Sequence, residues 1–269
     1  MRRLVLGVLL VAVSSPLIAQ SPSFDVASIK RTPEGQADVD FAATSGGRLQ
    51  ARNNPVLNLI TNAYGVPYYT VVGGPGWMRE SGDRYDIEAK ADREPSHAEM
   101  MQMLQTLLAE RFHLRVHRET RELSAYVLTV ARGGAKLTPS KEGDCVDRSS
   151  PEKRNALPST EKRPGCGNNS LSSRGATPPN MRWTAVRIDM SGVTGALATF
   201  FRRPVVDQSG ITGFFDIRLD LPPLQPTTRD DPGVSVFTVL QEQLGLRVEE
   251  GKGPVEVLVI DHIERPTPD

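Results

Sequence analysis

"FHLRVHRETRELSAYVLTV" (Phe112–Val130) and "LGLRVEEGKGPVEVLVIDH" (Leu244–His262) are the two stretches that decide the fold. Each begins with an apolar residue, continues through Leu-Arg-Val and a charged segment, and ends in an apolar run typical of a strand. We interpret each stretch as two strands joined by a turn. The four strands are expected over residues 112–119, 124–131, 246–250 and 255–263.

The residues before the first stretch are patterned as two helices between short strands. Asn54-Pro55 is typical of a helix start, with a capping residue followed by proline at the first helical position, and Gly65 is a suitable end. A Ser-x-x-Glu capping box from Ser96 to Glu99 predicts the second helix. Its buried face is predicted by apolar residues at helical spacing: Met100, Met103, Leu104, Leu107, Leu108 and Phe112.

The second half of the chain repeats this order. A strand over residues 182–188 leads into a helix that starts at Asp189 or Ser191. Residues 204–208 and 213–221 are interpreted as a pair of strands. A further helix follows Pro232 and precedes the second Leu-Arg-Val stretch.

Two landmarks recur at nearly the same displacement. Leu114-Arg115-Val116 returns 132 residues later at Leu246, and Tyr85-Asp86-Ile87 returns as a Phe-Asp-Ile triplet 130 residues later at Phe215. We therefore predict an internal duplication: an α+β protein of two tandem ferredoxin-like β-α-β-β-α-β-β modules with mostly antiparallel sheets. The alternative is that helix-then-hairpin units recur because such units are common.

A segment of different composition separates the halves. Residues 133–180 are rich in Ser, Pro, Gly, Lys and Arg and nearly lack large apolar side chains, so they cannot offset the entropy of their own ordering. The expected organisation is a signal peptide, a first α+β module, a Ser/Pro/Gly-rich linker loop and a second α+β module, at residues 1–20, 21–132, 133–180 and 181–269.

Cys145 and Cys166 are the two cysteines of the chain, and both lie in this linker. In an exported chain they indicate one disulfide, which would pin a loop rather than a core, while the alternative is two free thiols. Two cysteines without a nearby histidine cannot complete a four-ligand zinc site. We expect no metal and no cofactor.

The N-terminal residues have the pattern of a secretory signal peptide. Arg2 and Arg3 precede the apolar run Leu4–Val13, and small and polar residues follow. The apolar run is too short to span a bilayer comfortably. With cleavage near Ala19 or Gln20 we expect a periplasmic or secreted protein without a stable membrane span; the alternative is an uncleaved anchor.

Charge and motifs limit the function classes. Lys plus Arg number 32 and Asp plus Glu number 32, and this balance argues against a nucleic-acid partner, which requires a basic face. His113 and His117 are four residues apart on a predicted strand, roughly 13 Å on one face, so no single ion would bridge them. Asp207 in "VVDQSGITG" resembles an aspartic-protease turn, but Gln208 interrupts that pattern, and a hairpin turn is the better interpretation. We expect no catalytic residue.

Tyr68, Tyr69 and Trp77 are concentrated beside flexible glycines. Exposed aromatic side chains of this kind are typical of a binding surface for a partner or ligand. The alternative, which we favour, is that they close the core over the sheet.

Five strings carry a resemblance to a known family: "FDVASIKRT", "GGPGWMRESGDRYDIEAKA", "LLAERFHLRVHRETRELSAYVLTV", "RPVVDQSGITGFFDIRLDL" and "VLQEQLGLRVEEGKGPVEVLVIDHIERP". Together they resemble a Solibacter-type, acidobacterial family of exported proteins of unknown function. The resemblance implies no catalytic residues. It is compatible with a non-enzymatic binding or sensor-type module that binds an unknown protein or small-molecule ligand. The alternative is an uncharacterised extracytoplasmic hydrolase. A third hypothesis is assembly through exposed sheet edges.

Overall fold

The computed structural model describes residues 21–79, 82–148, 153, 155–158, 160–174, 180–222 and 235–266. The expected signal peptide at residues 1–20 lies outside this part of the chain. The fold divides into two compact units, each described by itself below: Met1–Gly65, Pro75–Arg115 and His262–Asp269 in the first, and Val66–Gly74 and Val116–Asp261 in the second.

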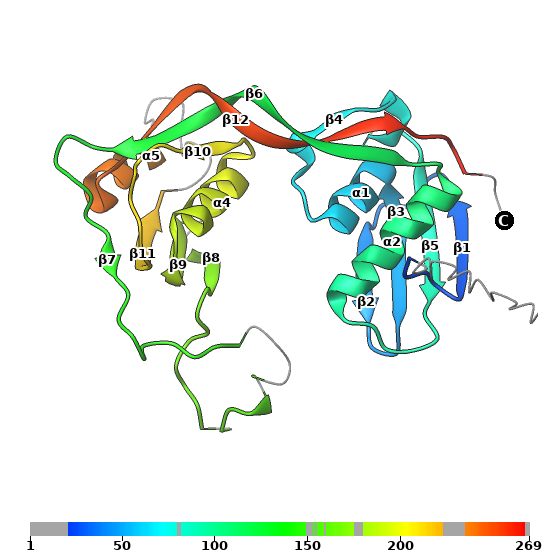
Figure 1. The fold of residues 1–269 in the computed structure, drawn as a ribbon, viewed down its shortest axis with the longest axis horizontal. Helices are drawn as coiled ribbons and strands as arrows, with labels where there is room; N and C mark the ends of the chain where they lie inside the picture. The colour runs from blue at the N-terminus through cyan, green and yellow to red at the C-terminus, as the bar shows by residue number, and fades with distance from the viewer. Residues whose placement is uncertain are drawn as a thin grey trace, which may run out of the picture. The chain divides into compact units, whose positions relative to one another are not determined.

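An antiparallel sheet, sheet A, with two helices packed on it forms the first unit (Figure 1). The strand order is β1-β5-β3-β2. Alternate residues of the central strands are buried, as the two-residue period of a strand requires, and the apolar faces of the helices cover them. The elements are β1 Val26–Arg31, β2 Asp40–Thr44, β3 Arg48–Pro55, α1 Val56–Tyr64, η2 Gly76–Met78, β5 Arg84–Lys90 and α2 His97–Arg111.

Helix α2 confirms the predicted capping box. The Glu99 N–H donates to the Ser96 hydroxyl at 3.3 Å, and the Ser96 N–H donates to the Glu99 carboxylate at 2.8 Å. A hydrogen bond from Arg93, together with these contacts, lowers the pKa of Glu99 to about 2. The predicted apolar face is buried throughout: Met100, Met103, Leu104, Leu107, Leu108 and Phe112.

Helix α1 starts one residue later than predicted. Pro55 is the N-cap rather than the first helical residue, and no side chain caps the helix. The Asn54 side chain is buried and instead donates to the carbonyls of Asp40 and Arg52, because a buried amide needs partners and these carbonyls lie within reach. The helix ends at Gly65, which has a φ of 62°, as the sequence predicted.

Sheet C of the second unit is antiparallel, with the order β7-β11-β9-β8. Its strands β7 and β8 come from the segment that was expected to be entirely a linker loop, so that expectation was wrong for these residues. Helices α4 and α5 and the short π-helix η3 complete its core. The elements are β7 Thr138–Pro139, β8 Asn169–Arg174, β9 Asn180–Ile188, α4 Met190–Phe201, β11 Phe215–Leu221, α5 Val236–Val239 and η3 Leu240–Leu244.

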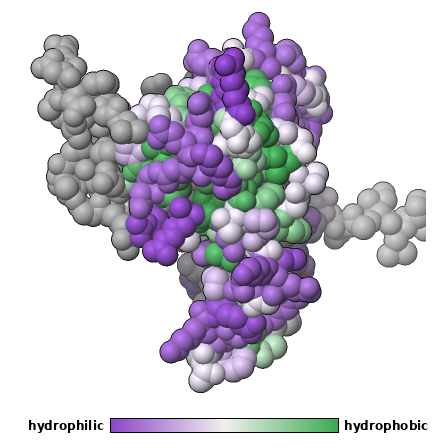
Figure 2. All heavy atoms as spheres, turned by 90° about the vertical axis from the view of Figure 1, so that its left-hand side faces the viewer, coloured by the Kyte–Doolittle hydropathy of each residue, from purple (hydrophilic) through white to green (hydrophobic). Residues whose placement is uncertain are grey.

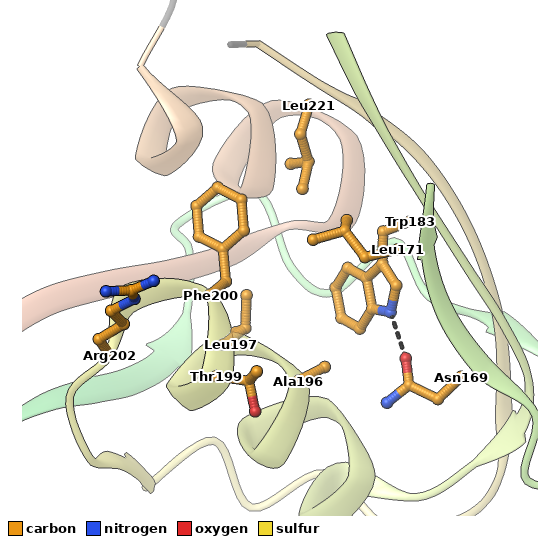
Figure 3. Close-up of a pocket in the computed structure, with 9 residues that line it drawn as sticks. All are labelled: Asn169, Leu171, Trp183, Ala196, Leu197, Thr199, Phe200, Arg202 and Leu221. Atoms are coloured by element: carbon orange, nitrogen blue, oxygen red, sulfur yellow. Dashed lines mark hydrogen bonds between the residues drawn. The ribbon is translucent and has the colours of Figure 1, made fainter. Parts of the chain in front are cut away.

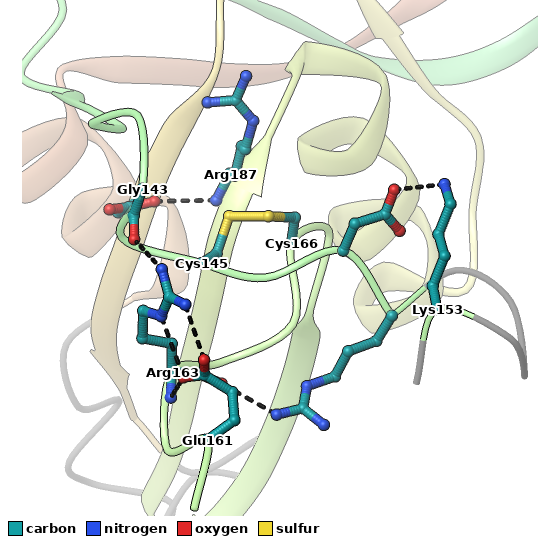
Figure 4. Close-up of a disulfide and its surroundings, with 10 residues drawn as sticks. Gly143, Cys145, Lys153, Glu161, Arg163, Cys166 and Arg187 are labelled. Carbon is teal, nitrogen blue, oxygen red and sulfur yellow. Dashed lines mark hydrogen bonds and ion pairs between the residues drawn. A yellow bond between two sulfur atoms is a disulfide. The ribbon is translucent and has the colours of Figure 1, made fainter. Parts of the chain in front are cut away.

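The predicted disulfide Cys145–Cys166 is present and joins two parts of the segment that was interpreted as a linker (Figure 4). Cys145 is buried, and the N–H of Cys166 donates to the carbonyl of Val146 at 2.9 Å. The N–H of Gly167 donates to Val186 of β9 at 2.8 Å. Both cysteines lie outside the named strands, as expected of a bridge that pins a loop, and this loop is itself hydrogen-bonded to β9.

Sheet B of the second unit corrects three strand predictions. Strands β6 (Arg115–Val130) and β12 (Leu246–His262) are each continuous, whereas two strands had been expected in each stretch. The charged central residues of β6 remain extended, because many of them reach solvent from the strand. Strand β10 (Val205–Asp207) pairs in parallel with β6 and not with β11.

The short strand β4 (Val71–Gly73), which follows the 3-10 turn η1 (Tyr68–Thr70), pairs in parallel with β12 and gives sheet B the order β10-β6-β12-β4. The chain is α+β with mostly antiparallel pairing, as predicted. The tandem ferredoxin-like arrangement is not confirmed, because β6 and β12 join a separate sheet instead of sheets A and C.

Sheets A and C contain the same irregularity, and it explains one repeated motif. Two residues of β3 lie opposite Asp86 alone, and two residues of β9 lie opposite Asp216 alone. The second residue of each pair has a left-handed backbone, Asn53 with φ 51° and Arg187 with φ 52°. The Asn53 N–H donates to Asp86 at 2.7 Å, and the Arg187 N–H donates to Asp216 at 2.8 Å. Each aspartate thus holds the bulge from which the next helix begins.

We predict that Asp86→Ala and Asp216→Ala each lower the free energy of unfolding by about 2 kcal/mol, because hydrogen bonds to charged groups contribute roughly 1.5–3 kcal/mol. Urea denaturation followed by circular dichroism measures the change. Asp220→Ala is the matched control, because the side chain of Asp220 on β11 is 62% exposed and its ion pair with Arg182 therefore contributes about 1 kcal/mol or less. Losses no larger than that of the control would contradict the role of the two bulge aspartates.

Candidate functional site

A pocket of about 400 Å³ lies between α4 and sheet C in the second unit (Figure 3). Helix α4 forms one wall, and strands β8, β9 and β11 form the other. Its volume is within the usual range for small-molecule sites. The lining residues are Asn169, Leu171, Trp183, Ala196, Leu197, Thr199, Phe200, Arg202 and Leu221.

The floor of the pocket belongs to the hydrophobic core. Trp183, Leu197 and Leu221 are each at most 3% exposed and pack in one cluster with the inward residues of β9, β11 and α4. Phe200 lies at the side, edge-on to Phe201, with ring centroids 5.3 Å apart. These packed side chains support the apolar wall, so the shape of the pocket does not depend on a surface loop.

One end of the pocket has an oriented amide. The Trp183 indole Nε1–H donates to the Asn169 side-chain oxygen at 2.7 Å. This bond sets which way the amide points, since an indole N–H needs an acceptor. The amide nitrogen of Asn169 has no hydrogen-bond partner among the described residues and remains available as a donor.

The other end, on the opposite side of Figure 3, has a cation. Arg202 ends α4 with a left-handed backbone, φ 52°, and its side chain lines the pocket. Within the described residues it has no acidic partner, whereas its neighbour Arg203 pairs with Glu250 at 2.9 Å. Arg202 is the one charged residue among the nine that line the pocket.

Exposed apolar residues add to the surface available for contact. Figure 2 shows a face on which hydrophobic side chains gather between hydrophilic ones. Leu171 on β8, which lines the pocket, is 44% exposed, so a ligand that covers its side chain would remove apolar surface from water.

The aromatic residues singled out from the sequence do not line this pocket. Tyr68 is 49% exposed and lies edge-on to the half-buried Tyr69, with ring centroids 5.4 Å apart. Burial raises the pKa of Tyr69. Both belong to the second unit, whereas Trp77 belongs to the first. A binding surface at these three residues therefore stays a prediction.

Trp77 has a partner within the first unit. The guanidinium of Arg265 lies over its ring, 5.0 Å from the centroid, and also pairs with the buried carboxylate of Asp83. Arg31 pairs with the same carboxylate at 2.7 Å. Trp77 therefore covers a charge network that attaches the C-terminal segment to the first unit.

The two histidines considered as metal ligands have different local structures. His113 has a left-handed backbone, φ 50°, just before β6, so it does not lie on a strand as predicted. His117 lies on β6, with its Nδ1 2.9 Å from Asp261 and its Nε2 3.7 Å from Glu119. Among the residues that the structure describes, no group of three or more His, Cys, Asp or Glu side chains is placed to hold a metal ion.

Asp207 accepts a hydrogen bond from the Ser209 N–H at 2.8 Å, as expected of an aspartate in a turn. The turn does not join two paired strands, because β10 pairs with β6 in sheet B and not with β11. The hairpin prediction was therefore wrong, although the local contact was right.

Sequence reasoning missed the pocket residues of β8 and α4. Asn169 and Leu171 lie in the segment interpreted as a linker, and Arg202 follows the predicted helix that starts at Asp189 or Ser191, to which no binding role was assigned. Leu171 is the one large apolar residue of the polar run 168–174, and a single apolar residue is too weak a pattern to predict a strand.

The family model described as "Protein of unknown function (DUF3738)" matches residues 57–263. The chain belongs to this family. No curated protein and no solved structure matches the chain. In the described part of the chain, none of the helices has the length and apolar character needed to cross a membrane.

We predict that Asp261→Asn lowers the pKa of His117. The hydrogen bond to Asp261 raises this pKa above its ordinary value of 6.5, with a smaller contribution from Glu119. Because the folded-state pKa is raised, the pair stabilises the fold fully below the unfolded-state pKa, and this contribution is lost as pH rises through the folded-state pKa. An NMR titration of the histidine ring protons measures the shift.

Glu256→Gln is the control for this titration. Glu256 pairs with the neighbouring Arg118 at 2.5 Å and makes no contact with His117. An unchanged His117 pKa in Asp261→Asn, or an equal decrease in both variants, would contradict the assignment.

Proposed function

We propose that this protein is a binding module that holds a small ligand in the pocket between α4 and sheet C. The observation that carries the proposal is the pocket itself, with a packed apolar floor and two donor groups, the amide nitrogen of Asn169 and the guanidinium of Arg202, for which the described chain offers no hydrogen-bond acceptor or acidic partner. Pockets that bind ligands usually combine apolar walls with a few placed polar groups.

We predict that the neutral probe 2-naphthylacetamide binds this pocket with a dissociation constant on the order of 1 mM, given about −0.3 kcal/mol per non-hydrogen atom. Amide chemical-shift changes in an NMR titration should map to β8, β9 and α4. Ala196→Phe should abolish these changes, because Ala196 lines the pocket and a phenyl ring would fill it.

Gly195→Phe is the matched control. It adds the same ring one residue away on α4, where an added Cβ meets no atom within 4 Å and the residue does not line the pocket. It should bind like the parent protein. Binding that survives in Ala196→Phe, or no shifts at β8, β9 and α4 in the parent, would reject the pocket as a ligand site.

We also propose that the protein acts outside the cytoplasm. The disulfide Cys145–Cys166 supports this, because such bonds persist mainly in oxidising compartments. The basic, apolar and small-polar order of the first twenty residues supports it as well.

We predict that protein isolated from the periplasm or the medium begins near Ser21 and has no alkylatable thiol. N-terminal sequencing and mass spectrometry under non-reducing conditions test both points. The control is the same protein after reduction, which should take up two alkyl groups. Recovery of the protein from the cytoplasm instead, as a chain that still begins at Met1 and has two reactive thiols before reduction, would contradict export.

An internal duplication is the third part of the proposal. The bulges at Asn53 and Arg187, each held by an aspartate at the equivalent place in its triplet, support it. So do the left-handed residues His113 and Gly245, each of which directly precedes a Leu-Arg-Val stretch. A loss of stability in only one of the two variants Asp86→Ala and Asp216→Ala would count against equivalent roles.

A further inference from the structure

We propose that the pocket selects ligands that have one carboxylate on an apolar body, and that the carboxylate binds Arg202. This inference rests on the binding function proposed above and names the chemical class of the ligand. The shared chemistry is a carboxylate beside a bulky apolar group, whether it belongs to a small organic acid or to the end of a peptide chain.

One end of the pocket is positively charged. Arg202 has the one charged side chain in the lining and has no acidic partner in the described chain. The arginines on either side of the pocket wall are already neutralised: Arg182 donates to Asp220 through two bonds of 2.6 Å, and Arg203 pairs with Glu250. A guanidinium stays protonated and presents paired N–H groups that match a carboxylate.

The polar group at the other end of the pocket, the amide of Asn169, also offers a hydrogen-bond donor. The indole of Trp183 occupies the oxygen of Asn169, which leaves the amide N–H₂ as the free function. Both ends of the pocket therefore offer donors, and a ligand has to supply acceptors. A cationic ligand would face Arg202 with a like charge and would be disfavoured.

The residues between these two polar groups favour a ligand with an apolar body. Between Arg202 and Asn169 the pocket surface is formed by Trp183, Phe200 and the aliphatic side chains of Leu171, Leu197 and Leu221. Aromatic rings of this kind favour offset or edge contacts with another ring. An aromatic or branched aliphatic body fits this lining better than a sugar, whose hydroxyl groups would lose water without gaining partners.

Arg202 also has a structural explanation that the test must separate. A cation at the C-terminal end of a helix interacts favourably with the helix dipole. That role predicts a change in stability when Arg202 is replaced, but no change in the preference between an acid and its amide.

The experiment compares 2-naphthylacetate with 2-naphthylacetamide, which have nearly the same size and differ in charge. In isothermal titration calorimetry with the full chain, we expect the acid to bind about tenfold more tightly than the amide, and the preference to weaken as salt is added. Arg202→Gln should remove the preference, so that the acid and the amide bind with equal affinity.

Arg203→Gln is the matched control. Arg203 lies next in sequence, pairs with Glu250 and stacks on Tyr126 at 5.0 Å, and it does not line the pocket. It should keep the tenfold preference. Equal affinities for acid and amide in the parent protein, or a preference that persists in Arg202→Gln, would overturn the inference while leaving the binding function intact.

Two further outcomes are distinguishable. If neither probe binds, the proposed function fails together with this inference. If an acetylated tetrapeptide ending in phenylalanine binds more tightly than 2-naphthylacetate and its C-terminally amidated form does not, the carboxylate comes from a peptide chain end; otherwise a small acid is the source.

Discussion

The hydrogen bond from the Arg187 N–H to Asp216, 2.8 Å long, is the contact on which the candidate site depends most directly. It holds Arg187 in a left-handed conformation at the end of β9, where an ordinary side chain is disfavoured. Because Asp189 then caps α4 at once, the direction of the helix follows from the bulge. The pocket lies between that helix and the strand from which it leaves.

The same kind of bulge, held by an aspartate, occurs in sheet A, but the helix that follows it packs differently. There Asp86 holds Asn53, and α1 begins three residues later, but the helix packs against α2. In sheet C the edge strand β8 brings Asn169 and Leu171 to the pocket. The pocket on sheet C therefore needs both the bulge and a strand from the segment between the two halves.

The binding chemistry follows from unequal pairing of charges. Two arginines near the pocket, Arg182 and Arg203, pair with the exposed carboxylates of Asp220 and Glu250, and such pairs contribute little to stability. Arg202 is an exception among the described residues, and it lies at the edge of an apolar pocket whose floor is buried core. A cation with a free guanidinium beside apolar surface suits an amphipathic anion better than either feature would by itself.

Local patterns were sufficient for much of the secondary structure. Residue spacing was sufficient to predict the capping box at Ser96, the apolar face of α2 and the end of α1 at Gly65. It also gave Asp189 as one of two possible starts of α4, and Asp189 is the N-cap of that helix. Errors arose where pairing partners were distant in sequence. Strands 205–207 and 215–221 look like a hairpin, yet β10 pairs with β6, because β6 offers an open edge that no local signal reveals.

The sequence by itself determined the α+β class, the approximate positions of helices α1, α2 and α4, the disulfide partners and the repeated triplets, because these depend on residue periodicity, on local capping and on there being two cysteines. Only the tertiary structure decided that β6 and β12 run unbroken into a separate sheet, that part of the presumed linker becomes β8, and that Asn169, Trp183 and Arg202 meet at one pocket. Strand pairing and pocket formation depend on contacts between residues far apart in the chain. Their free energy comes from shared burial, which no short window of sequence contains.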